Sequence, residues 1–225
     1  METLWRQALK TFSGCQNNTY KLCPKNFEKL KYLMNNMTCN DVKVDKTILD
    51  IVEKQDAPMS VINIYENNDI TIAIFLLKHG VTLPMHDHPG MHGLLKVICG
   101  SVKIDTYTIQ VEPDEKINYH EGVMAVKHPP IIADKNSSAC VLSPDERNFH
   151  EIHCTNGPAA FLDILSPPYD IDYEEFDKSI RPCTFFRQSS QDNHSINETN
   201  VKLIAFELPS KFYSTNLQYL GPPLR

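Results

Sequence analysis

Two histidines separated by one residue, His86 and His88, lie within a regular frame of glycines and constrain the fold of this chain more than any other feature. On a β-strand, residues i and i+2 point to the same face, so both imidazoles can bind one metal ion. Gly80, Gly93 and Gly100 frame the pair at intervals of five, four and six residues. Strand patterns flank the frame, so we expect a metal site rather than two surface histidines.

Helices are predicted near the start of the chain. Apolar residues recur at helical spacing over Leu4–Phe12 and again over Phe27–Met37. The first of these segments lacks the apolar core of a secretory signal. No repeat or linker divides the chain, so we predict one domain over 1–225, with a helical cap over 1–45 and a barrel over about 50–215.

After the helices, short apolar runs of strand length alternate with turns, which many of the fifteen prolines and eight glycines mark. Asn67-Asn68 and Gly100-Ser101 are predicted to be hairpin turns between neighbouring strands. Many short strands with frequent turns indicate a mainly β fold, an antiparallel sandwich or barrel with a helical cap. The predicted strands are Val61–Tyr65, Ile70–Leu77, Leu94–Cys99, Val102–Ile109, Met124–Lys127, Ala139–Leu142, Phe149–Cys154, Ala159–Leu165 and Val201–Leu208.

Composition excludes several classes of function. The chain has 225 residues, 41% of them hydrophobic and 22% charged, as in a globular protein that buries a large core. Its net charge of −6 argues against binding to nucleic acid or to an anionic membrane surface, and no apolar run approaches the length of a membrane span. Seven cysteines, an odd number at irregular spacing, indicate reduced thiols. We therefore expect a cytoplasmic monomer.

A third metal ligand is predicted from strand alternation. His150 shares one face of its predicted strand with the apolar residues Ile152 and Cys154, whereas His153 shares the opposite face with Phe149. The interior of a barrel is lined by the apolar face. We therefore predict that His150 completes the site and that His153 lies outside it.

The glycine-framed histidine pair resembles the first sequence motif of the cupin family, which implies a double-stranded β-helix, or jelly-roll barrel. A typical cupin has glutamate where this chain has Gly93, so histidines alone are left to bind the metal. The second cupin motif places its histidine after a proline-containing turn, which Ser143–His150 supplies, although Arg147 replaces the usual glycine. The remaining six histidines are expected to have structural or surface roles, and His92 is the most plausible of them as an alternative group that supports a ligand. Imidazole ligands suit iron, zinc, copper and nickel.

Two longer runs, Met85–Lys96 and Gly157–Asp170, resemble the cysteamine dioxygenase/plant cysteine oxidase family of thiol dioxygenases. The resemblance covers roughly residues 50 to 215. It implies a cupin barrel in which Fe²⁺, held by three histidines, oxidises a thiol with O₂ to a sulfinic acid. The family acts on cysteamine or on proteins with an N-terminal cysteine, and so serves as an oxygen sensor. The ligands that carry over by motif position are His86, His88 and His150.

The second run also supplies two candidate catalytic residues, Asp163 and Tyr169. Asp163 lies in an otherwise apolar strand, and a buried carboxylate costs several kcal/mol unless it is paired, so it should have a dedicated partner. It either positions the substrate amine or a ligand histidine, or belongs to a structural network under the barrel mouth. Tyr169 follows Pro167-Pro168, and its hydroxyl either points into the pocket or its ring packs on the rim.

The sequence therefore predicts a non-haem iron thiol dioxygenase. It does not distinguish between cysteamine and peptides with an N-terminal cysteine as the substrate. Some animal members form a cysteine–tyrosine crosslink in a Cys-x-Tyr segment, but Phe185 replaces the tyrosine after Cys183 here. The polar stretch Gln188–Asn200 is predicted to be a long mobile loop. The alternatives are another cupin metal reaction, such as dioxygenolytic C–C cleavage or isomerisation, and a non-catalytic cupin module that senses a metal or a small thiol.

Overall fold

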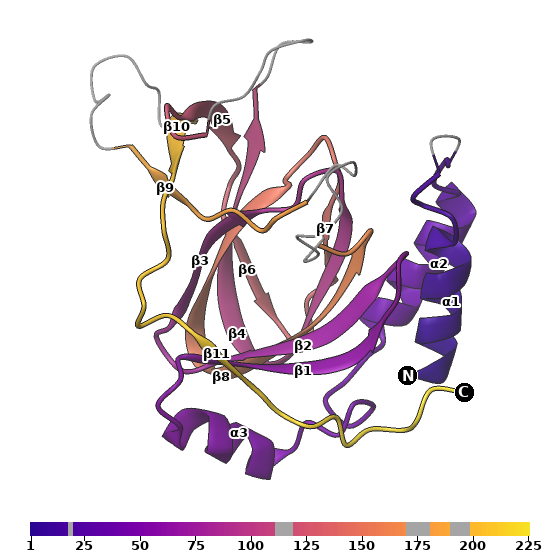
Figure 1. The fold of residues 1–225 in the computed structure, drawn as a ribbon. Coiled ribbons are helices and arrows are strands. Elements are labelled where there is room, and N and C mark those ends of the chain that lie inside the picture. The colour runs from indigo at the N-terminus through magenta and orange to yellow at the C-terminus, as the bar shows by residue number, and fades with distance from the viewer. Residues whose placement is uncertain (18–19, 111–118, 170–180, 190–198) are drawn as a thin grey trace, which may run out of the picture.

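The computed structural model describes residues 1–17, 20–110, 119–169, 181–189 and 199–225. Within these ranges the helices α1 (Glu2–Phe12), α2 (Pro24–Asn35) and α3 (Lys46–Lys54) precede all the strands. Both chain termini lie beside α1 (Figure 1). None of the described helices is long and apolar enough to cross a membrane.

The strands form a barrel, with α1 and α2 together on one flank (Figure 1), which confirms the predicted mainly β jelly roll with N-terminal helices. Most neighbouring strands run antiparallel, and the short last strand joins the edge of the sheet in parallel. The strands are β1 (Met59–Glu66), β2 (Thr71–Leu77), β3 (Thr82–Asp87), β4 (His92–Ile109), β5 (Val123–Lys127), β6 (Ile131–Asp134), β7 (Cys140–Leu142), β8 (Phe149–Ser166), β9 (Phe186–Gln188), β10 (Asn200–Ala205) and β11 (Ser214–Asn216).

Two long strands, β4 and β8, are the spine of the barrel. They pair antiparallel along almost their whole length, from His92 opposite Ser166 to Tyr107 opposite Phe149. The second half of β8 pairs with β2, which in turn pairs with β1. The first half of β8 pairs with β3, and the second half of β4 pairs with β5 and β6. The two halves of each strand therefore belong to the two facing sides of the barrel.

The predicted hairpin at Gly100-Ser101 is wrong, because the chain bends there without reversing. The β4–β8 register shifts at this point, and Gly100 has a φ of +67°. A Cβ atom on Gly100 would lie only 2.5 Å from the carbonyl oxygen of Asn156 on the partner strand. Glycine thus permits a bulge and a close strand contact, which local sequence alone does not distinguish from a turn.

The buried apolar side chains of the described residues form three clusters. One cluster packs α1 and α2 against the outer face of the sheet, through Leu4, Phe12, Leu30, Met34, Ile72, Ile74, Leu94 and Ile164. A second cluster fills the barrel interior, through Leu77, Leu83, Leu95, Val97, Ile104, Ile152 and Phe161. A third, smaller cluster includes Phe149, Phe186 and Leu203. The helix α3 was not predicted, although Asp45 caps it by accepting a hydrogen bond from the Ile48 N–H. The helices cover the outer face and leave the interior to the site.

Candidate metal centre

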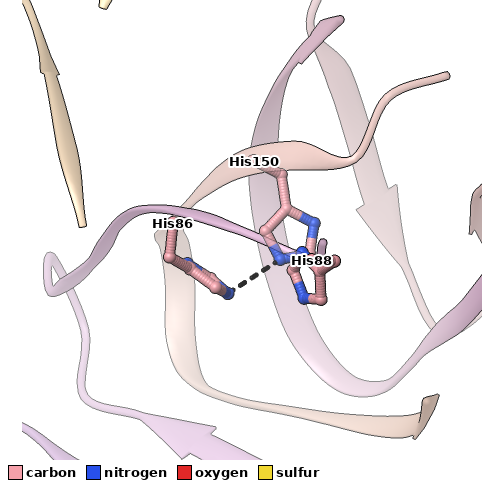
Figure 2. Close-up of side chains that lie close together, drawn as sticks. All are labelled: His86, His88 and His150. Atoms are coloured by element: carbon pink, nitrogen blue, oxygen red, sulfur yellow. Dashed lines mark hydrogen bonds between the residues drawn. The ribbon is translucent and has the colours of Figure 1, made fainter. Parts of the chain in front are cut away.

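The three predicted ligand histidines meet at one end of the barrel interior. His86 on β3 is paired in the ladder with His150 on β8, and His88 follows the end of β3. The Nε2 atoms of His86 and His150 are 3.2 Å apart, and the candidate ligand atoms of all three rings lie within 4.8 Å of one another. Figure 2 shows the three rings turned toward one another. Within the described residues this is the one such cluster of potential metal ligands.

The environment keeps these rings neutral. His86, His88 and His150 are 7%, 1% and 5% exposed. Burial lowers the pKa of His86 to about 4. Burial, followed by the neighbouring imidazoles, holds the pKa of His88 and of His150 well below the ordinary value. Neutral imidazoles keep the nitrogen lone pair that binds a metal, so the donor set fits a divalent transition-metal ion.

Backbone carbonyl groups orient two of the rings. The Nδ1 atom of His86 lies 2.8 Å from the carbonyl oxygen of Pro84, and that of His88 lies 3.3 Å from the carbonyl oxygen of Asn148. A carbonyl oxygen can only accept, so each Nδ1 carries the proton and donates it. The Nε2 atoms of these two rings are then free to bind the metal.

The residue that replaces the cupin glutamate cannot be enlarged without a clash. A Cβ atom on Gly93 would lie 2.7 Å from Cγ of Leu142, which comes from the neighbouring strand β7. Leu142 therefore fills the space into which a side chain at position 93 would start. This packing leaves no room for a glutamate at position 93 and so supports a donor set of three histidines. The sequence pattern alone does not indicate this role of Leu142.

A cavity of about 140 Å³ adjoins the histidines. Its other polar lining residues are Asp163, Tyr169 and Cys183, and its described lining contains no lysine or arginine. The remaining wall is apolar, formed by Met59, Phe75, Leu83, Ile152, Phe161, Leu165 and Phe185. The cavity thus suits a small molecule with few charges, placed directly beside the ligand histidines.

Asp163 lies in this cavity wall on β8 and is only 7% exposed. Burial raises its pKa from 3.8 to about 7, and a hydrogen bond from the Ile164 N–H partly offsets this. The dedicated side-chain partner expected for a buried carboxylate is not found within the described ranges. The carboxyl group is instead a polar group at the cavity, available to a ligand with a positive charge.

Tyr169, Cys183 and Phe185 form another part of the cavity wall, here called the closing wall. The rings of Tyr169 and Phe185 have their centroids 5.6 Å from His88 and 5.9 Å from His86, respectively. The Tyr169 hydroxyl donates a hydrogen bond to the carbonyl oxygen of Asp87. Burial holds the pKa of Tyr169 well above its ordinary value and raises that of the neighbouring Cys183 thiol to about 12.

Three other residues singled out by the sequence lie away from the cluster. His92 lies under the helical cap, with its ring centroid 6.2 Å from that of Phe12, so it has the structural role expected by default and does not support a ligand histidine. His153 is bonded to Thr82, with its Nδ1 atom 2.7 Å from the threonine hydroxyl, outside the three-histidine cluster as predicted. Arg147 has a φ of +57°, the left-handed conformation that explains why glycine is usual there. Most of Gln188–Asn200, namely 190–198, lies outside the described residues.

Comparison with known proteins finds a matching family model and similar sequences. A model of the PCO_ADO family matches residues 33–224. The 2-aminoethanethiol dioxygenase of Homo sapiens is 33% identical over 73% of this chain and 66% of its own length. That of Mus musculus is 31% identical over 83% of this chain and 78% of its own. Plant cysteine oxidase 1 of Arabidopsis thaliana is 23% identical over 77% of this chain and 59% of its own length. A solved structure, KdgF from Halomonas sp., aligns with a TM-score of 0.37 and 12% identity over 50% of this chain and 82% of its own.

Proposed function

Because this chain belongs to the PCO_ADO family, we propose that it is a thiol dioxygenase, which adds both atoms of O₂ to a thiol sulfur and forms a sulfinic acid. The observation that carries the proposal is the buried cluster of three neutral histidines beside a small cavity. The three histidines would hold the metal, and the cavity adjoins the cluster that they form.

We propose Fe²⁺ as the metal, held by His86, His88 and His150. Three imidazoles would also accept zinc, copper or nickel, so the preference for iron is supported by the family and not by the donor set alone. When bound, Fe²⁺ supplies the electronic chemistry that allows O₂ to react with a thiol. The chain contributes ring orientation, through Pro84 and Asn148, and an apolar cavity that limits access of water.

The proposed substrate has an amine close to its thiol. Asp163 is the acidic group of the cavity, and an ammonium group beside it would favour the ionised carboxylate and be neutralised by it. The described lining offers no cation for a substrate carboxylate, so a free α-carboxylate would be buried without a partner. Cysteamine and a peptide with N-terminal cysteine both meet these conditions. Two relatives are named 2-aminoethanethiol dioxygenase and plant cysteine oxidase, which supports this choice.

We also propose that the enzyme is cytoplasmic and monomeric and that it serves as an oxygen sensor. The seven cysteines are all free thiols, which is usual in a reducing compartment. An enzyme that consumes O₂ in proportion to its concentration can report that concentration through its product, and an N-terminal cysteine on a protein would carry such a signal.

The proposal is tested by loading the metal-free protein with Fe²⁺ under anaerobic conditions and then admitting O₂. Mass spectrometry should show a gain of about 32 mass units on cysteamine or on a peptide with N-terminal cysteine, the change from thiol to sulfinic acid. Free cysteine should be a poor substrate. With labelled O₂, both oxygen atoms of the product should carry the label. Recovery of disulfide alone, or of label from water, would reject dioxygenation; metal and thiol binding without O₂ uptake would favour the non-catalytic module.

A further inference from the structure

The closing wall meets the metal-binding strand at an isolated β-bridge between His86 and Phe185 and at Asp87, which contacts both of its segments. Asp87 is the last residue of β3, lies between two ligand histidines and is 2% exposed. Its carboxylate Oδ1 accepts a hydrogen bond of 2.8 Å from the N–H of Thr184, and its own N–H donates to the carbonyl oxygen of Thr184 at 3.1 Å. Its carbonyl oxygen accepts from the Tyr169 hydroxyl. Both segments of the closing wall thus contact the same residue.

Only one of these bonds depends on the side chain. Any residue at position 87 would offer the backbone N–H and carbonyl groups, whereas the bond from Thr184 requires an acceptor side chain. Adjacent residues on a strand point to opposite faces, so the carboxylate points away from the face of His86 and reaches the segment that carries Cys183 and Phe185. A carboxylate buried to this degree is costly unless it is hydrogen-bonded, and it is absent from the cavity lining.

We propose that Asp87 is a positioning residue that holds the closing wall against the metal centre and thereby sets the affinity for the thiol substrate. Asp87 is not among the residues that line the cavity, and it acts through Thr184 and Tyr169. The inference rests on the proposed function for the identity of the ligand, but the attachment itself is a property of the folded chain.

The test compares Asp87→Ala with Asp87→Asn in Fe²⁺-loaded protein. The dissociation constant for cysteamine is measured by calorimetry without O₂, and KM and kcat are measured with O₂. Loss of a buried bond to a charged acceptor should weaken cysteamine binding about tenfold in Asp87→Ala, with a matching rise in KM, a smaller change in kcat and unchanged iron content. Asp87→Asn keeps an acceptor oxygen and should recover most of the affinity. Hydrogen exchange should show that the Thr184 amide loses protection in Asp87→Ala but keeps it in Asp87→Asn.

A second variant removes the donor of the same hydrogen bond, the Thr184 N–H, which is distant in sequence from the ligand histidines. Thr184→Pro lacks the N–H group and should weaken cysteamine binding as much as Asp87→Ala, with no further loss in the double variant. Asp105→Ala removes another buried carboxylate, which pairs with Lys103 at 2.8 Å on β4, and should leave cysteamine affinity unchanged.

Three results would overturn the inference: unchanged cysteamine affinity in Asp87→Ala, loss of iron from Asp87→Ala while Thr184→Pro binds cysteamine normally, or additive effects of the two variants. Absence of any sulfinate from the wild-type protein would instead refute the proposed function. The hydrogen-exchange result would still decide whether Asp87 holds the wall.

Discussion

The two walls of the cavity are built in different ways. The wall formed by the barrel strands carries the ligand histidines and Asp163. In the strand ladders His86 lies opposite His150, and Asp163 lies between Ala73 and Leu95. His88 follows the end of β3, and its N–H donates a hydrogen bond of 2.8 Å to the carbonyl oxygen of Asn148. The closing wall belongs to segments outside those ladders, and it is connected to β3 through one isolated β-bridge between His86 and Phe185 and through hydrogen bonds to Asp87. The same cavity thus has one side fixed by many bonds and one side fixed by few.

This difference separates two requirements of the site. A metal centre needs its ligand atoms held in place within about 0.5 Å, and ladder pairing provides this for His86 and His150. Substrate binding tolerates a wall attached by a few hydrogen bonds, each worth about 1 kcal/mol net. Changes in the barrel wall should therefore affect metal binding, stability or turnover, whereas changes in the closing wall should mainly affect substrate affinity.

The largest effect is expected from loss of a ligand. His86→Ala, His88→Ala and His150→Ala should each lose most iron and activity, with metal affinity reduced by more than about 100-fold, because loss of even a second-sphere partner costs 10- to 100-fold. Iron content after gel filtration and O₂ uptake would measure this. His153→Ala is the matched control, since His153 is bonded to Thr82 outside the cluster. Normal iron content in His150→Ala, with iron loss in His153→Ala, would reverse the assignment.

The next effect tests the packing of the barrel wall beside the metal. Gly93→Ala should lower the free energy of unfolding by about 2 kcal/mol, because the new methyl group meets Leu142 at 2.7 Å in a filled core. Chemical denaturation of the metal-free protein would measure this. Leu142→Ala removes the obstacle, so the double variant should be more stable than the sum of the two single changes predicts. Additive losses would show that Leu142 does not occupy that space.

Asp163→Asn should preserve the fold and the iron content, because the amide has nearly the same shape. Turnover should fall at least tenfold, equivalent to about 1.4 kcal/mol of transition-state stabilisation, if the carboxylate positions the substrate amine. The measurement is activity per iron-loaded molecule with cysteamine. A purely structural carboxylate would give a different result: lower thermal stability with unchanged activity per loaded molecule.

The pH dependence of stability gives an independent test of Asp163. Its pKa is raised from 3.8 to about 7 by burial, so the folded protein holds this proton more tightly than the unfolded chain does. The group therefore stabilises the fold at low pH, and this contribution is lost as the pH rises from about 4 to 7. In metal-free protein, the stability of the wild type relative to Asp163→Asn should fall across this window. A difference that does not vary with pH would mean that the carboxyl group is not buried as described.

The two walls also differ in how far the sequence predicts them. His86, His88 and His150 were found because strand alternation and glycine spacing are local patterns, and Asp163 because a carboxylate in an apolar strand is conspicuous. The contact of Asp87 with Thr184 joins residues 97 positions apart and leaves no periodic signal. The bulge at Gly100 was mistaken for a turn, since glycine suits both, and Leu142 became informative only when the structure placed it against Gly93.

The smallest effect is expected at Tyr169, where the closing wall loses a single hydroxyl. Tyr169→Phe keeps the ring beside His88 and removes the hydrogen bond to the Asp87 carbonyl. The expected loss in kcat/KM is about fivefold, corresponding to one hydrogen bond of about 1 kcal/mol, and it should appear mainly in KM. Steady-state kinetics with cysteamine would measure it, with Asp163→Asn as the comparison from the barrel wall. An equal fall in kcat for both variants would show that the hydroxyl acts on the reacting atoms, and the division of labour between the walls would then be wrong.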